Sequence, residues 1–442
     1  MFFNHKYFSR RALGLGLLVG IGLTGAAGCG LIGPGKTTAV IQVSVNGQDV
    51  TAACPAIERG GLIYLPFLAV IEQMGGVAAE VEAAAAGWSE SGWPGAIRGN
   101  TNQPNTNQSG PGWSGPGRGV LAIRADGTPI AYRWGALTAR VGDGEAVLGA
   151  ASIIDKAGTG YAPLSLIETV LEAKAAGDAG HVRLTGPGSG SDGMGPSPAK
   201  AYVKALASVR NAPFFEADRL LRYAAYIERN PELPAAAALV RVNINLDKEF
   251  YTGVEVVSAP EDLLVLCNKY NQLPSDYVPP DLAELPGGHF LRAPAAEAYQ
   301  KMADAAAAEE LTFHLRSTYR SYESQAELYD GYSARESQAA ADMYSARPGH
   351  SEHQTGLAFD VTQPVTGGNL TAAAFQNTEQ YAWLREHAHE FGFILRYPED
   401  KTKITGYIYE PWHYRYVGPE TAAVIHGEGL TLDEYWGKYK TP

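Results

Sequence analysis

The sequence contains little cysteine and few basic side chains for its length. Its 442 residues include only three cysteines, Cys29, Cys54 and Cys267. Cysteines this far apart make neither a disulfide framework nor the closely spaced pairs of a zinc ribbon. Lysine and arginine number 35 against 47 acidic residues, which gives a net charge of -12. A chain this acidic is not expected to bind nucleic acid, because phosphate contacts require clustered positive charge.

A hydrophobic run long enough to cross a bilayer comfortably is also missing near the start. Residues 12–27 are apolar but short and rich in glycine, and they follow the basic residues Lys6, Arg10 and Arg11. A basic start followed by a short apolar run predicts an export signal over residues 1–28. The Arg10-Arg11 pair is also similar to a twin-arginine signal, so the export route stays open.

The predicted export signal ends in small residues directly before Cys29. Ala26, Ala27 and Gly28 precede this cysteine, as in a bacterial lipobox, although Ala26 stands where that motif usually has leucine. We interpret Cys29 as a lipidation site that becomes the mature N-terminus and anchors the chain in the membrane. The alternative is a plain signal peptide with an incidental cysteine.

The length predicts two or three domains, and the first covers residues 38–185. Its first half has a hairpin signal at Asn46-Gly47 and a helix-like stretch at 67–74. Its second half repeats this order, with a strand at 120–124 and a helix at 164–175. We therefore predict a module built from two related halves.

This repeated order resembles the N-terminal domain of copper amine oxidases, which recurs in exported Gram-positive proteins. The resemblance implies a spacer or a wall-binding module, and it does not imply copper, because His181 is the only histidine in the segment. Residues 88–119 interrupt the module and are predicted to form an exposed loop. Residues 186–198 are rich in Gly, Ser and Pro, which predicts a flexible linker.

The second large domain is expected to span residues 199–442. Its helices and strands alternate without a regular βαβ repeat, so we predict an α+β fold with helices packed on a small antiparallel sheet. Helices are expected at 200–231, 294–310, 322–344 and 378–391, and strands at 239–246, 311–317 and 356–361.

Two segments near the C-terminus carry the residue types of a catalytic metal site. The first holds His353 and Asp360, and the second holds Glu410 and His413. A catalytic zinc takes three nitrogen or oxygen ligands and keeps one position open. Two imidazoles and one carboxylate meet that need, and a separate carboxylate can transfer protons.

Other histidines have no such pattern around them. His387 and His389 stand beside acidic residues in an expected helix and are interpreted as a solvated face. His314, His350 and His426 have no partner at an informative spacing. Any single histidine is more often a core or surface residue than a ligand, so the joint pattern decides.

The joint pattern resembles the VanY-type D-alanyl-D-alanine carboxypeptidases, which are zinc metallopeptidases of the LAS type. Their motif S-x-H-x-x-G-x-A-x-D is present from Ser351, and E-x-W-H from Glu410. Upstream, Y-R-S-x-x-x-Q is present from Tyr319. All fixed positions are present in order, and the resemblance covers about the last half of the chain.

The resemblance implies a role for each matching residue. The zinc ligands would be His353, Asp360 and His413. Glu410 would act as general base and acid, and Arg320 would bind the developing oxyanion or the substrate carboxylate. Ser351 and Gln325 would hold the substrate, unless Ser351 only caps a turn and Gln325 lies on a solvated helix face.

The implied activity is removal of the C-terminal D-alanine from peptidoglycan stem peptides, at the outer face of the membrane, facing the cell wall. An L,D-carboxypeptidase or a D,D-dipeptidase of the same fold is the close alternative. A cell-wall-binding lipoprotein that has lost catalysis is the alternative of another class. No ligand or general base of the motif is missing, which favours an enzyme.

Overall fold

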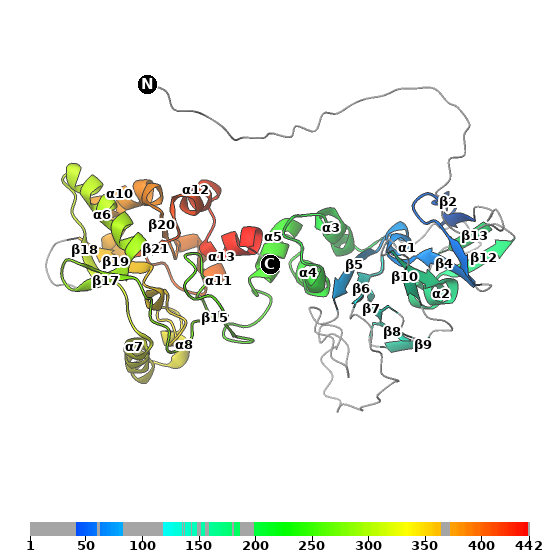
Figure 1. The fold of residues 1–442 in the computed structure, drawn as a ribbon, viewed down its shortest axis with the longest axis horizontal. Helices are drawn as coiled ribbons and strands as arrows, with labels where there is room; N and C mark the ends of the chain where they lie inside the picture. The colour runs from blue at the N-terminus through cyan, green and yellow to red at the C-terminus, as the bar shows by residue number, and fades with distance from the viewer. Residues whose placement is uncertain are drawn as a thin grey trace, which may run out of the picture. The chain divides into compact units, whose positions relative to one another are not determined.

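The computed structural model describes most of the chain after residue 40. The described residues are 41–59, 62–82, 118–134, 136, 138–142, 144–147, 152–154, 159–178, 181–185, 199–363 and 372–440. The predicted export signal, Cys29, the linker at 186–198 and almost all of the loop at 88–119 lie outside them. The described part includes no helix with the length and apolar character of a membrane span. Its helices and small sheets give an α+β fold, as predicted (Figure 1).

Three small sheets make up the first region. One has the order β12-β13-β1-β2 and consists of β1 (Gln42–Val45), β2 (Gln48–Asp49), β12 (Lys174–Asp178) and β13 (His181–Thr185). A second has the order β10-β11-β4-β3 and consists of β3 (Ile57–Arg59), β4 (Leu62–Pro66), β10 (Ile153–Ile154) and β11 (Gly160–Pro163). The third runs in sequence order through β5 (Val77–Glu82), β6 (Arg118–Ile123), β7 (Pro129–Arg133), β8 (Thr138–Val141) and β9 (Gly144–Val147). The predicted hairpin turn joins β1 to β2, with Asn46 at φ 50° and Gly47 at φ 83°.

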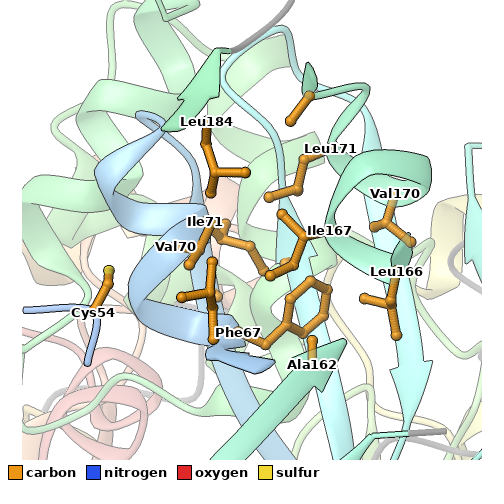
Figure 2. Close-up of a cluster of buried hydrophobic side chains, with 14 of the residues drawn as sticks. Cys54, Phe67, Val70, Ile71, Ala162, Leu166, Ile167, Val170, Leu171 and Leu184 are labelled. Atoms are coloured by element: carbon orange, nitrogen blue, oxygen red, sulfur yellow. The ribbon is translucent and has the colours of Figure 1, made fainter. Parts of the chain in front are cut away.

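Two helices supply much of the core of this region. Helix α1 (Phe67–Gln73) and helix α2 (Leu164–Leu171) place Phe67, Ile71 and Ile167 in one buried cluster (Figure 2). The prediction that the second helix runs to residue 175 is wrong. The helix ends at Leu171 because Glu172 adopts a left-handed conformation, and strand β12 follows.

Three helices follow the linker: α3 (Ala201–Val209), α4 (Leu220–Arg229) and α5 (Ala235–Asn243). The strand expected at 239–246 is wrong, because α5 covers most of it. An alanine run after Pro234 favours helix, and Leu239 and Val242, three residues apart, are both buried. These helices share a buried cluster with β5–β7. The helix expected over 200–231 is interrupted between α3 and α4.

The C-terminal region centres on a four-stranded antiparallel sheet of the kind predicted. Its order is β18-β19-β21-β20, formed by β18 (His314–Ser317), β19 (Ala358–Thr362), β20 (Phe393–Leu395) and β21 (His413–Tyr416). Helices α6 (Ala293–Ala308) and α10 (Glu379–His387) pack on it through a shared cluster that includes Met302, Phe359 and Leu384 (Figure 1).

Short elements complete this region. The strands are β14 (Glu255–Val256), β15 (Asn271–Gln272), β16 (Leu282–Leu285) and β17 (His289–Arg292). The helices are α7 (Tyr322–Arg335), α8 (Gln338–Ala341), α9 (Ala372–Phe375), α11 (Thr402–Thr405), α12 (Pro419–Glu428) and α13 (Leu432–Tyr435). The single helix expected over 322–344 is therefore wrong. Helix α7 ends at Arg335. The Ser337 side chain then accepts a hydrogen bond from the Ala340 amide and caps the start of α8.

Candidate metal centre and active site

Three neighbouring strands place the proposed site residues opposite one another. Asp360 in β19 is paired with His413 in β21 on one side and with Ser317 in β18 on the other. Directly opposite residues of antiparallel strands project on the same face, so these side chains converge. His353 comes from the 3₁₀ helix η3 (Glu352–Thr355), which ends at Gly356 with φ 66°. A side chain there would strain the turn that leads from His353 into β19.

His353, Asp360 and His413 form a compact donor cluster. Nδ1 of His413 lies 3.0 Å from Oδ1 of Asp360, and Nε2 of His353 lies 3.4 Å from Oδ2 of Asp360. One ligand atom from each residue lies within 4.8 Å of the others. Within the described residues, no other group of histidine, cysteine or acidic side chains meets this condition. The structure thus brings together the three residues that the motifs proposed as ligands.

The donor cluster fits a divalent cation. Nδ1 of His353 lies 2.7 Å from the Thr318 carbonyl oxygen, which can accept its proton and leave the Nε2 lone pair free. Burial lowers the pKa of His413, but the Asp360 and Glu352 carboxylates outweigh burial and raise it to about 9. The surroundings therefore favour a positive charge at this position, and two imidazoles with one carboxylate are a set that zinc accepts.

Glu410 lies beside this cluster on the turn that leads into β21. Its side chain is buried, with Oε2 3.8 Å from Nδ1 of His413. Burial raises the pKa of Glu410 to about 8, and the charge of Asp360 adds to that effect. A bound cation would lower it again. Such a carboxyl group can both accept and release a proton near neutral pH.

Arg320 is held by Ser317 and by Gln325 and Ser351, the two residues that were proposed to contact the substrate. Its Nε donates to Oε1 of Gln325 at 2.7 Å, and its Nη1 donates to Oγ of Ser317 at 3.1 Å. Nη2 lies 3.5 Å from Oγ of Ser351. The guanidinium is thus fixed in one orientation while its charge is permanent.

Gln325 and Ser351 are both buried, which excludes the solvated face considered for Gln325. The Gln325 amide nitrogen donates to the Ala346 carbonyl oxygen at 2.7 Å, so its side chain bridges that loop and Arg320. The Ser351 side chain does not cap η3, although the residue precedes this helix. The positions of both side chains therefore indicate that they orient Arg320.

The sequence did not predict a buried ionic network that Glu352 forms with two arginines next to the site. Oε1 of Glu352 accepts hydrogen bonds from Arg396 Nε at 2.7 Å and from Arg415 Nη1 at 2.9 Å. Burial opposes ionisation of Glu352, but the two arginines hold its pKa well below its usual range. The sequence signal for Arg396 was its position directly after the short apolar strand β20.

The histidines interpreted as bystanders lie in other contacts. His387 pairs with Glu390 at 3.2 Å near the surface, as expected of a solvated face. His389, which was interpreted as part of the solvated face, instead stacks on His426, with ring centroids 3.9 Å apart. Nδ1 of His350 lies 2.7 Å from the Asn268 carbonyl oxygen.

A hollow of about 420 Å³ opens at the first turn of α7, which begins two residues after Arg320. Its lining carries three acidic side chains and comprises Ser275, Asp276, Tyr322, Glu323, Ala326 and Glu327. None of the three proposed ligands borders it.

Known proteins are similar to part of this chain. The profile of the family VanY, D-alanyl-D-alanine carboxypeptidase, matches residues 288–419. YodJ of Bacillus subtilis (strain 168) is 41% identical over 197 residues, which cover 42% of this chain and 72% of that protein. A D-alanyl-D-alanine carboxypeptidase of Enterococcus faecalis (strain ATCC 700802 / V583) is 40% identical over 193 residues, covering 42% and 69%.

Solved structures include the vancomycin resistance D,D-pentapeptidase VanY, a mutant in complex with Zn(II). It is 41% identical, with a TM-score of 0.34, over 39% of this chain and 97% of that one. The residues matched by the family profile contain the donor cluster, Glu410 and Arg320. The chain belongs to the VanY family of D-alanyl-D-alanine carboxypeptidases.

Proposed function

We propose that the protein is a zinc-dependent carboxypeptidase that removes the C-terminal D-alanine from peptidoglycan stem peptides. The observation that carries this proposal is the convergence of two imidazoles and one carboxylate beside a separate buried carboxyl group, Glu410. His353, Asp360 and His413 would hold the metal. Zinc, when bound there, supplies a Lewis acid that polarises the scissile carbonyl and makes water acidic.

The protein's own residues account for the remaining chemistry. Glu410 takes the proton of the attacking water and passes it to the leaving amine of D-alanine. Arg320 holds the terminal carboxylate of the peptide or the carbonyl oxygen that gains charge, because its fork suits either anion. Gln325 and Ser351 keep that fork in place through the contacts described above. Proton transfer by Glu410 and anion binding by Arg320 require no further charged residue in the site.

Defined stem peptides test the proposal directly. The zinc-loaded protein should convert a pentapeptide ending in D-Ala-D-Ala to a tetrapeptide, and mass spectrometry should show release of one D-alanine. A pentapeptide ending in L-Ala-L-Ala serves as the matched control and should stay intact. Cleavage of only a tetrapeptide would indicate the L,D-carboxypeptidase, and cleavage of only the free dipeptide would indicate the dipeptidase. No cleavage at all would favour the wall-binding alternative.

We also propose that a lipid on Cys29 anchors the protein outside the cell, facing the wall. The support comes from the sequence, in the basic start, the short apolar run and the small residues before the cysteine. Residues 1–28 would then be absent from the mature chain. The catalytic domain, assigned to 199–442, would act on peptidoglycan near the membrane.

Replacing Cys29 by serine should release the protein from the membrane, because the thioether to the lipid cannot form. Fractionation followed by intact mass measurement checks this, and the wild type should carry the added mass of lipid. Cys54→Ser changes another cysteine and should leave the protein membrane-bound. Equal membrane association and equal processing of Cys29→Ser would contradict the anchor.

We further propose that residues 38–185 form a spacer or wall-binding module with two related halves, similar to the N-terminal domain of copper amine oxidases. The order β4-α1-β5 recurs as β11-α2-β12, which supports the internal relationship. Parallel pairing of β1 with β13 joins the first and last strands of the region. Such a module would hold the catalytic domain at a distance from the anchor.

A further inference from the structure

Glu352 faces His413 from the side opposite the donor cluster. Its Oε2 lies 3.6 Å from Nε2 of His413, and both atoms are buried without a hydrogen-bond partner. The other oxygen of Glu352 already accepts from two arginines. Two unsatisfied polar atoms that face each other at this distance form a hydrogen bond after a small side-chain shift.

The tautomer of His413 makes this contact important for metal binding. Nδ1 is the nitrogen that lies beside Asp360, so it is the one available to a metal. A histidine that binds through Nδ1 must carry its proton on Nε2, and that proton points at Glu352. We propose that Glu352 is a positioning residue that fixes the tautomer and ring orientation of His413, and thereby sets zinc affinity. His353 receives the equivalent support from the Thr318 carbonyl oxygen.

The network around Glu352 holds its carboxylate in place. Arg396 also donates to Oδ2 of Asp433 at 2.6 Å, and Arg415 donates to the Leu263 and Val265 carbonyl oxygens at 3.0 Å. Two buried arginines are thus balanced by two buried carboxylates. Both arginines are therefore fixed by other contacts, and they hold the carboxylate of Glu352 where its free oxygen faces His413.

Zinc affinity in paired variants tests the inference, which rests on the proposed zinc site. Glu352→Gln should weaken zinc binding by about 10- to 100-fold, the usual cost of losing an outer carboxylate partner. Asp433→Asn is the matched control, because it removes a buried charge from the same network without facing His413. It should destabilise the metal-free fold in a similar way and leave zinc affinity almost unchanged. Competition with a chromophoric chelator gives the dissociation constants.

Glu352→Asp covers the case in which Glu352→Gln does not fold. Aspartate retains the charge that balances Arg396 and Arg415 but withdraws the oxygen from His413, so zinc affinity should still fall at least about tenfold. Wild-type affinity in Glu352→Asp, or an equal loss in Glu352→Gln and Asp433→Asn, would overturn the inference. A wild type that binds zinc but cleaves no stem peptide would instead contradict the proposed function, and the affinity comparison would still decide the role of Glu352.

Discussion

Replacing Glu410 by glutamine is expected to remove most turnover while zinc and the fold are retained. Glutamine has the shape of glutamate but cannot take a proton from water and return it to an amine. General acid–base catalysis contributes about 10²- to 10⁴-fold, so the rate on a D-Ala-D-Ala-ending peptide should fall by at least that range. Bound zinc and rate are to be measured on the same sample.

A competing interpretation makes Glu410 an orienting partner of His413. That role predicts zinc affinity weakened by about 10- to 100-fold and activity restored by excess metal. The geometry favours catalysis, because Oε2 of Glu410 lies 3.8 Å from His413 Nδ1, too far for a hydrogen bond and on the side of the proposed metal. Near-normal turnover of zinc-loaded Glu410→Gln would contradict the catalytic role. Glu420→Gln, at an exposed position of α12, is the matched control.

Glu410→Gln should also change the pH dependence of stability in the metal-free protein. Burial raises the pKa of Glu410 from 4.5 to about 8, so the folded state binds more protons than the unfolded state between these values. Stability from this group is therefore present below about pH 4.5 and is lost as the pH rises through about 8. Glu410→Gln lacks this loss, and its melting temperature should fall less than that of the wild type between pH 5 and pH 8.

Replacing His413 by alanine is expected to prevent stoichiometric zinc binding and to abolish activity. The change removes one of three proposed ligands and leaves Asp360, Glu352 and Glu410 without the imidazole between them. The loss of affinity should exceed the roughly 10- to 100-fold typical of an outer partner. Zinc content after dialysis, measured by elemental analysis, checks the expectation.

Thermal melting gives a second measurement for the same variant. Zinc at about 100 times its dissociation constant stabilises a protein that binds it only when folded by about 2.7 kcal/mol. The wild type should therefore melt at a higher temperature with zinc, and His413→Ala should not respond. His387→Ala is the matched control, because His387 lies outside the donor cluster and contacts Glu390 and Trp383. Full zinc content and activity in His413→Ala would rule out the proposed site.

The sequence by itself determined the helices and the hairpin that are specified by neighbouring residues. Alanines after Pro294 predicted α6, Thr378 and Gly392 bracketed the α10 region, and Asn46-Gly47 predicted the first hairpin. The resemblance of the motifs to those of the VanY family implied the donor residues, and the structure brings those three residues together. The domain limits, the lipid anchor and the resemblance of the first module stay predictions.

The sequence patterns gave wrong secondary structure in two segments of the second large domain. The segment 239–246 alternates like a strand, yet the preceding alanines and the burial of one helical face favour α5. The long helix expected from 322 ended early, because Ser337 offers its side chain as a new N-cap. Packing decided the first case, and a local side-chain cap decided the second.

Tertiary structure alone decided what surrounds the donor residues. Register in the antiparallel sheet sets Asp360 opposite His413, and no local pattern of either strand specifies that pairing. Tertiary structure also decided the surroundings of Glu352. Glutamate is usually exposed, but Glu352 is buried between Arg396 and Arg415, which are 44 and 63 residues away in the sequence. Burial and long-range charge pairing depend on how distant segments of the chain meet. They set the pKa values of buried carboxyl and imidazole groups, so these values cannot be read from the local sequence.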